Sequence, residues 1–238
     1  MYKRQVLGQG ALDLLEADST AAVARGLKER LGRPEPVLTD GAGHAWPAEA
    51  ALALLVKKLA RDAQTFKQEA VGGAVVTVPV SFGDAERRAA KHAARMAGLP
   101  EPELLDEPIA AATYHAWRDP VRDGERTLLV YDLGGGGFEA SVVQVTSEGL
   151  FVFASEAAPS AGGRRFDDAL GAAIIDALRR RGIEAGDDPV TALTLGRVAE
   201  ALKRELGTAG SPVVRRLLLL GGRACELAVS RSQLARSP

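Results

Sequence analysis

The sequence predicts an α/β protein, and three observations support this prediction. Short β-branched apolar runs alternate with segments whose apolar residues recur at three-to-four spacing. Farther along, three runs of strand length follow one another with only short glycine-containing turns between them. Hydrophobic residues make up 46% of the 238 residues, which is enough for a sizeable core. One or two globular domains are therefore expected.

Helices and strands alternate in the first half of the chain. Residues 19–32 are expected to form a helix that begins at a capping Ser or Thr and ends at a glycine. A long amphipathic helix is expected from residue 47 to about residue 68. The β-branched run 74–80 predicts a buried strand that ends near its proline. A third helix is expected over 84–98, capped by the aspartate at its start, and a fourth over 108–117.

The second half begins with three expected strands, over residues 127–133, 138–145 and 149–157. Because only short turns join them, they are expected to form an antiparallel meander. Two helices are expected next, over 161–182 and 191–207, the second of them closed by a glycine. The last thirty residues predict two more strands.

Composition and charge exclude several classes of protein. Lys and Arg number 30 and Asp and Glu 31, so the net charge of −1 gives no basic surplus for general nucleic-acid binding. The single cysteine, Cys225, cannot form an internal disulfide, and no charged segment followed by an apolar segment opens the chain. The longest apolar run is too short to cross a bilayer. The expected location is the cytoplasm, with neither nucleic acid nor membrane as a partner.

The sharpest motif is Asp132-Leu133 followed by four glycines, Gly134 to Gly137, between two expected strands. Residues without Cβ let backbone N–H groups approach an anion closely, as a phosphate cradle requires. A carboxylate at the end of the preceding strand then holds a hydrated Mg²⁺ or orients a water. A strand follows the glycines and no Gly-Lys-Ser/Thr triplet occurs, which argues against dinucleotide-binding and Walker A motifs. The plain alternative is a loose turn without a ligand.

Four further segments decide between these interpretations. VVTVPVSFGDAERRAAKHAARMAGL, LLDEPIAAATYHA, LLVYDLGGGGFEASVV and AGGRRFDDAL occur in the order and near the spacing of the nucleotide-binding domain of 70-kDa heat-shock (DnaK-like) chaperones. STAAVARGLKERLGR resembles the lysine-bearing segment of that family, and VAEALKRELG resembles its adenosine-contacting helix. The resemblance implies the actin-like ATPase (ribonuclease H-like) fold, partial here, with one lobe in residues 1–120 and the second in 121–238.

The resemblance also implies a site for ATP or ADP with Mg²⁺. Lys28, Glu107 and Asp132 match the catalytic positions, with Mg²⁺ held through water near Glu107 and Asp132 and by no protein side chain directly. The implied nucleotide-binding residues are Gly134, Gly135, Gly136, Gly137, Gly162, Gly163, Glu200, Lys203 and Arg204. Pro79 and Arg87 match positions that relay the nucleotide state to a substrate domain.

The sequence departs from the family pattern at several places. The family hairpin reads Gly-Gly-Gly-Thr-Phe-Asp, so Gly137 replaces a threonine and Glu139 an aspartate. Gly207 stands where a serine would reach adenosine. The first phosphate loop and the second, glycine-rich loop of the family are not found in the sequence, so the expectation is a fold incomplete at both ends and marginally stable alone.

The expected function is that of an ATP-hydrolysing module of a chaperone active in protein folding and the stress response. Its implied partners are unfolded client peptides, bound through a substrate domain that this sequence lacks, a J-domain co-chaperone and a nucleotide-exchange factor. One alternative is a nucleotide sensor or scaffold that kept the fold and lost turnover. A sugar- or acetate-kinase relative is a weaker alternative, because the DEPIAAA and VPVSF segments speak against it.

Several chemically notable residues have plain structural explanations. His44, His92 and His115 show no metal-ligand spacing and are expected to be surface or packing residues. Cys225 is expected to be a small core residue. The arginines 179–181 end an expected helix, where they complement its dipole.

Overall fold

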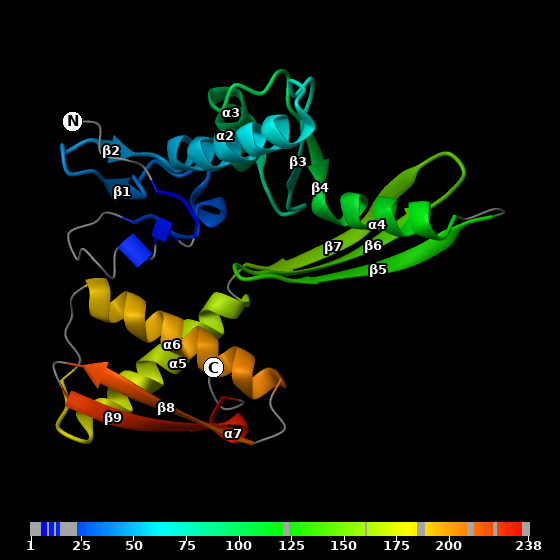
Figure 1. Cartoon of the computed structure of the whole chain (residues 1–238). Coiled ribbons are helices and arrows are strands. Elements are labelled where there is room, and N and C mark those ends of the chain that lie inside the picture. The colour runs from blue at the N-terminus through cyan, green and yellow to red at the C-terminus, as the bar shows by residue number, and fades with distance from the viewer. Residues whose placement is uncertain are drawn as a thin grey trace. The chain divides into compact units, whose positions relative to one another are not determined.

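The computed structural model of the chain describes residues 6–8, 10–11, 13–14, 23–120, 124–159, 161–184, 189–208, 212–220 and 223–234 (Figure 1). The chain forms two compact units. Unit 1 comprises Met1–Ala11, Ala21–Asp132 and Phe138–Pro159, and unit 2 comprises Leu12–Thr20, Leu133–Gly137 and Ser160–Pro238. Among the described residues, no helix has the length and apolar character needed to cross a bilayer.

Unit 1 opens with short elements and continues with alternating helices and strands. The elements are η1 (Lys28–Arg30), β1 (Leu38–Thr39), β2 (Ala45–Trp46), α2 (Ala48–Lys67), β3 (Val75–Val78), α3 (Asp84–Met96), β4 (Glu103–Asp106) and α4 (Glu107–Arg118). β3 and β4 are parallel, with Val78 opposite Asp106. The two strands therefore end at the same edge, where α4 begins directly after β4 and a short loop leads from β3 to α3.

Alanines line the contact between α2 and α3. Ala48 of α2 and Ala89 and Ala90 of α3 are buried, and they share one core with Leu31 and Val78. Small side chains let two helices approach closely, and alanine has the highest helix propensity. The sequence therefore specifies both the helices and their close packing.

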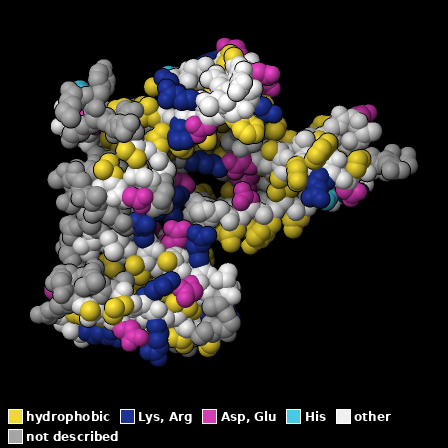
Figure 2. Space-filling view, viewed as in Figure 1, with side chains coloured by type: hydrophobic (Ala, Val, Ile, Leu, Met, Phe, Trp, Pro, Cys, Tyr) yellow, Lys and Arg dark blue, Asp and Glu magenta, His cyan; other side chains and the backbone are white. Residues whose placement is uncertain are grey.

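A meander of three strands completes unit 1. β5 (Arg126–Leu133), β6 (Phe138–Val145) and β7 (Leu150–Ala158) lie in this order, and β6 and β7 are antiparallel. α4 packs along one face, over the buried alternate residues of β6, Ser141, Val143 and Val145 (Figure 1). Exposed apolar side chains of β5 and β7 line the meander elsewhere, as Figure 2 shows: Leu129, Tyr131, Phe151 and Phe153.

Unit 2 consists of two helices packed over a β-hairpin. Its elements are α5 (Gly163–Arg179), α6 (Pro189–Thr208), β8 (Val213–Leu220), β9 (Arg223–Ser230) and the short α7 (Arg231–Leu234). Leucines and an isoleucine of the helices and alternate residues of the strands form its core, which includes Cys225 as expected. The periodic helix positions and the alternating strand positions thus converge on one core.

Most predicted elements are confirmed, with four corrections. β3 was predicted as a buried strand, but only Val78 is buried, and Val75 and Thr77 are exposed. The helix predicted over 19–32 is wrong in its described part, because residues 23–27 are not helical and only the 3₁₀ turn η1 follows. Gly26 has φ of 63°, in the left-handed region, which interrupts a right-handed helix. Gly83, and not Asp84, is the N-cap of α3. α6 continues through Gly207 to Thr208.

Candidate functional site

The end of the parallel pair β3 and β4 positions two predicted catalytic residues. Glu107 is the first residue of α4, immediately after β4 ends at Asp106. Its carboxylate forms an ion pair and hydrogen bond with the ammonium of Lys28 in η1. The glutamate side chain is 23% exposed and the lysine side chain 48%, so the pair lies at the rim of the unit. Lys28 and Glu107, 79 positions apart in sequence, are therefore direct partners.

A cavity of about 180 Å³ in unit 1 brings Glu107 together with Asp132. Asp132 lies near the end of β5, and Glu139, the second residue of β6, lines the same cavity. The remaining lining residues are Pro108, Ala111, Val130, Tyr131 and Ser141. The cavity thus combines three carboxylates with the wall of α4. Oxygen ligands of this kind suit a hydrated divalent cation.

Glu139 lines the candidate site, although the sequence predicted no role for it. Its Oε1 accepts hydrogen bonds from the backbone N–H of Val80 at 3.3 Å and from the hydroxyls of Ser141 and Ser155 at 3.4 Å each. The two serine hydroxyls are themselves 2.9 Å apart. Glu139 therefore ties β6 to the loop after β3. The alternation of side chains along β6 could have indicated this residue, because Glu139 lies two positions before the buried Ser141 and therefore on the same face of the strand.

Pro79 and Arg87, the two predicted relay positions, are in contact. Arg87 in α3 donates from Nη2 to the carbonyl of Pro79 at 3.5 Å and from Nε to the carbonyl of Phe82 at 2.9 Å. The same Nη2 donates to Oδ1 of Asp106 at 2.7 Å. One guanidinium therefore connects the loop after β3 with the residue that precedes Glu107.

In unit 2 the glycine hairpin packs against the N-terminus of α5. The hairpin is closed by the Gly134 N–H, which donates to the Gly137 carbonyl at 3.0 Å. The first N–H groups of α5, from Gly163 and Arg164, donate to the carbonyls of Gly134 and Gly135 at 2.9 Å each. Helix N-termini lack internal acceptors for these groups, so the hairpin satisfies them. This geometry fixes the hairpin at a helix N-terminus, where the dipole favours anions.

Gly162 is required for this packing. A Cβ at Gly162 would lie 2.3 Å from the nitrogen of Gly137, 2.4 Å from the carbonyl carbon of Gly136 and 2.7 Å from the oxygen of Gly135. Real Cβ atoms essentially never come this close to other heavy atoms. The predicted glycines of the hairpin and of the α5 N-terminus are thus brought together by backbone contact.

The three predicted residues of α6 separate into two groups. The Lys203 ammonium donates to the Gly163 carbonyl at 2.9 Å and lies 2.7 Å from Oδ1 of Asp167. Glu200 and Arg204 instead face one another across one helical turn, with Nη1 and Oε1 3.9 Å apart. Lys203 is therefore placed beside the α5 N-terminus, whereas Glu200 and Arg204 lie in a solvent-accessible pair. Asp167 was not predicted, and only its position in the FDD segment could have indicated it.

Within the described residues, no three His, Cys, Asp or Glu side chains are arranged so that they could hold a metal ion. The carboxylates of unit 1 and the glycine backbone of unit 2 are the groups suited to a hydrated cation and to phosphate.

A comparison with protein families gives a match across most of the chain. The family model described as Hsp70 protein matches residues 21–235. The matched range contains every site residue that the sequence predicted.

Proposed function

Because the chain belongs to the Hsp70 family, we propose that it is an ATP-binding and ATP-hydrolysing module of a chaperone, with the actin-like fold. The proposed first lobe comprises residues 1–120 and the second 121–238. The mixed α/β character with several small sheets is consistent with this fold. Limited proteolysis, with cleavage concentrated near residue 120, would support this boundary.

The observation that carries the proposal is the Lys28–Glu107 pair at the cavity shared with Asp132 and Glu139. In the proposed reaction the Glu107 carboxylate orients the attacking water and accepts its proton. The Lys28 ammonium stabilises the charge on the transferred phosphoryl group. Asp132 orients water from the other wall of the cavity.

Glycines are proposed to bind the nucleotide phosphates. Gly134 closes the hairpin, the backbone N–H groups of Gly135, Gly136 and Gly137 are the proposed phosphate donors, and Gly162 and Gly163 hold that hairpin in shape. Lys203 is proposed to contact the ribose or a phosphate near the α5 N-terminus, while Glu200 and Arg204 contact the adenosine.

The side chains that line the cavity carry the type of ligand atom that suits Mg²⁺. Glu107, Asp132 and Glu139 offer carboxylate oxygens, the ligand type that Mg²⁺ prefers, and Mg²⁺ usually keeps several of its waters. When bound, the ion neutralises phosphate charge. We propose that these side chains hold it through water.

A second candidate function is that of a nucleotide sensor or scaffold without turnover. Gly137 favours it, because this position lacks the hydroxyl that the family's threonine would direct to the γ-phosphate or the water. Losing one hydrogen bond to a charged transition state costs roughly 1.5–3 kcal/mol, about ten- to a hundredfold in rate. A chain that binds ATP and hydrolyses it slowly would combine properties of both candidate functions, the ATPase and the sensor.

The proposed chaperone role couples the site to client binding. The contact of Arg87 with the Pro79 carbonyl supports a relay from the loop after β3, in the manner of the family. Client peptides, a J-domain co-chaperone and a nucleotide-exchange factor are the proposed partners. A cytoplasmic location and a part in the stress response belong to the same proposal, and neither nucleic acid nor membrane is proposed as a partner.

Titration calorimetry with Mg-ATP and single-turnover hydrolysis test the proposal. Glu107→Gln and Asp132→Asn should leave binding intact and lower the hydrolysis rate about 100-fold or more. Glu148→Gln, at an exposed carboxylate in the turn between β6 and β7, is the control and should change neither quantity. Binding without turnover would favour the sensor, and absence of Mg-ATP binding would contradict both functions.

A further inference from the structure

Asp106 occupies the junction at which β4 turns directly into α4. It is the last residue of the strand and the N-cap of the helix, with φ of −68° and ψ of 134°. Aspartate at this position ordinarily accepts a hydrogen bond from the N2 or N3 backbone N–H. Here its side chain makes no capping bond, and the N2 residue, Pro108, has no N–H to offer. The carboxylate therefore has another use.

That use is the contact with Arg87. The Nη2–Oδ1 distance is 2.7 Å, and the two side chains are only 30% and 31% exposed. A charge-assisted hydrogen bond of this length in a half-buried position is stronger than an exposed ion pair. Because Arg87 also donates to the carbonyls of Pro79 and Phe82, its planar guanidinium holds three points at once.

We propose that Asp106 is a positioning residue for Glu107. Its bond to Arg87 fixes the backbone of the β4–α4 junction against the loop after β3, and the next residue, Glu107, is thereby directed toward Lys28 and the cavity. Without this bond the junction loses a side-chain contact with α3, and the Glu107 carboxylate is free to leave Lys28. The kinetic part of the inference rests on the proposed function, whereas the geometric part does not.

Zero-length cross-linking with a water-soluble carbodiimide tests the geometric part without nucleotide. The reagent joins an ammonium to a carboxylate in contact with it, and peptide mass spectrometry measures the Lys28–Glu107 product. Asp106→Ala should lower this yield about tenfold, the size expected from losing a charged hydrogen bond. Asp106→Asn should retain most of the yield, because its amide oxygen still accepts a bond from Arg87.

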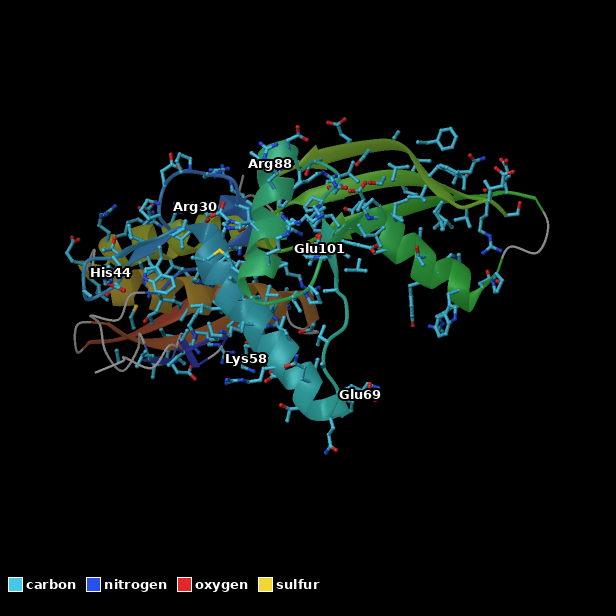
Figure 3. All side chains as sticks on the ribbon, turned by 90° about the horizontal axis from the view of Figure 1, so that it is seen from above. Arg30, His44, Lys58, Glu69, Arg88 and Glu101 are labelled. Atoms are coloured by element: carbon cyan, nitrogen blue, oxygen red, sulfur yellow. The ribbon has the colours of Figure 1, made fainter. Side chains whose placement is uncertain are left out.

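Two controls separate positioning from general damage. The Lys58–Asp62 pair of α2 is an internal reference in the same sample and should keep its yield in every variant. Glu101, labelled in Figure 3, lies in the exposed loop after α3 and pairs with another arginine of that helix, Arg95. Glu101→Ala removes this pair and should not change the Lys28–Glu107 yield. If Asp106→Ala fails to fold by circular dichroism, Arg87→Lys takes its place, since a point charge does not span the three acceptors.

An unchanged Lys28–Glu107 yield in folded Asp106→Ala, or an equal loss in Glu101→Ala, would overturn the proposal. In the kinetic arm, Asp106→Ala should lower the kcat of ATP hydrolysis about tenfold with little change in KM, and Asp106→Asn should restore most of kcat. A wild-type chain that hydrolyses no ATP would contradict the proposed activity alone, because the cross-linking result would still decide the role of Asp106.

Discussion

Replacing Gly162 with alanine should separate the glycine hairpin from α5. The new Cβ would lie 2.3 Å from the Gly137 nitrogen, and its other close neighbours are also backbone atoms of the hairpin. Backbone cannot move aside as a flexible side chain does. The hairpin would have to shift by about 1 Å to restore an ordinary contact.

The expected magnitude follows from the contacts that such a shift disturbs. Forcing an extra methyl into a packed region costs typically about 1–3 kcal/mol. Two backbone hydrogen bonds, from Gly163 to Gly134 and from Arg164 to Gly135, bridge the same contact, and each contributes about 0.5–1.5 kcal/mol. We expect the free energy of unfolding of unit 2 to fall by about 2–6 kcal/mol in total.

Urea denaturation followed by far-UV circular dichroism measures this loss. Fluorescence is unsuited, because both tryptophans, Trp46 and Trp117, lie in unit 1. Gly171→Ala, inside α5, is the matched control, because a Cβ there meets nothing within 4 Å, and it should raise stability by about 0.5–1 kcal/mol. Equal midpoints for Gly162→Ala and the wild type would refute the packing argument.

Three other predictions address the chemistry and the two units. Gly137→Thr should raise the single-turnover rate of ATP hydrolysis about ten- to a hundredfold, and an unchanged rate would contradict the role assigned to this position. Leu202→Ala, at a fully buried core position of α6, should lower the free energy of unfolding by about 2–5 kcal/mol in urea denaturation. Hydrogen bonds from the His44 backbone N–H and the Trp46 indole hold the pKa of the Asp40 carboxyl well below its usual range. These bonds stabilise the β1–β2 hairpin, in which His44 is labelled in Figure 3. The stabilisation is complete above the pKa of an unfolded aspartate and is lost as pH falls through the folded pKa. Lowering the pH should therefore broaden the Trp46 indole NMR signal, and Asp40→Asn should remove this pH dependence.

The sequence predicted most helices and strands because their apolar periodicity and the residues at their two ends indicated the same element. β6 has the predicted bounds, and α2 differs from its predicted range by only one residue at each end. The prediction of a helix over 19–32 was wrong in its described part because it relied on the apolar spacing. That spacing does not reveal the left-handed φ of Gly26. Local patterns report local conformation well, but one backbone torsion overrides them.

The sequence predicted which residues form the candidate site, and the structure supplies contacts among them that the sequence did not predict. Family motifs supplied Lys28 and Glu107, and the structure adds that they pair directly. No sequence pattern indicated that the Asp106 carboxylate would bond to Arg87 instead of capping α4. This contact depends on the parallel register of two strands that lie 28 positions apart in the sequence. Contacts set by tertiary register lie beyond what spacing along one chain specifies.

Two properties of the hairpin can be separated by substitution, and this separation bears on the choice between ATPase and sensor. Its shape depends on Gly162 and on bonds to α5, which are intact in the structure. Its proposed catalytic role depends on the side chain at position 137, where a glycine provides no hydroxyl. We therefore expect Gly162→Ala to weaken Mg-ATP binding and Gly137→Thr to change the hydrolysis rate with little effect on binding. If Gly137→Thr tightened binding without any turnover, the carboxylates of unit 1 would not be acting on the nucleotide, and the sensor would be the better account.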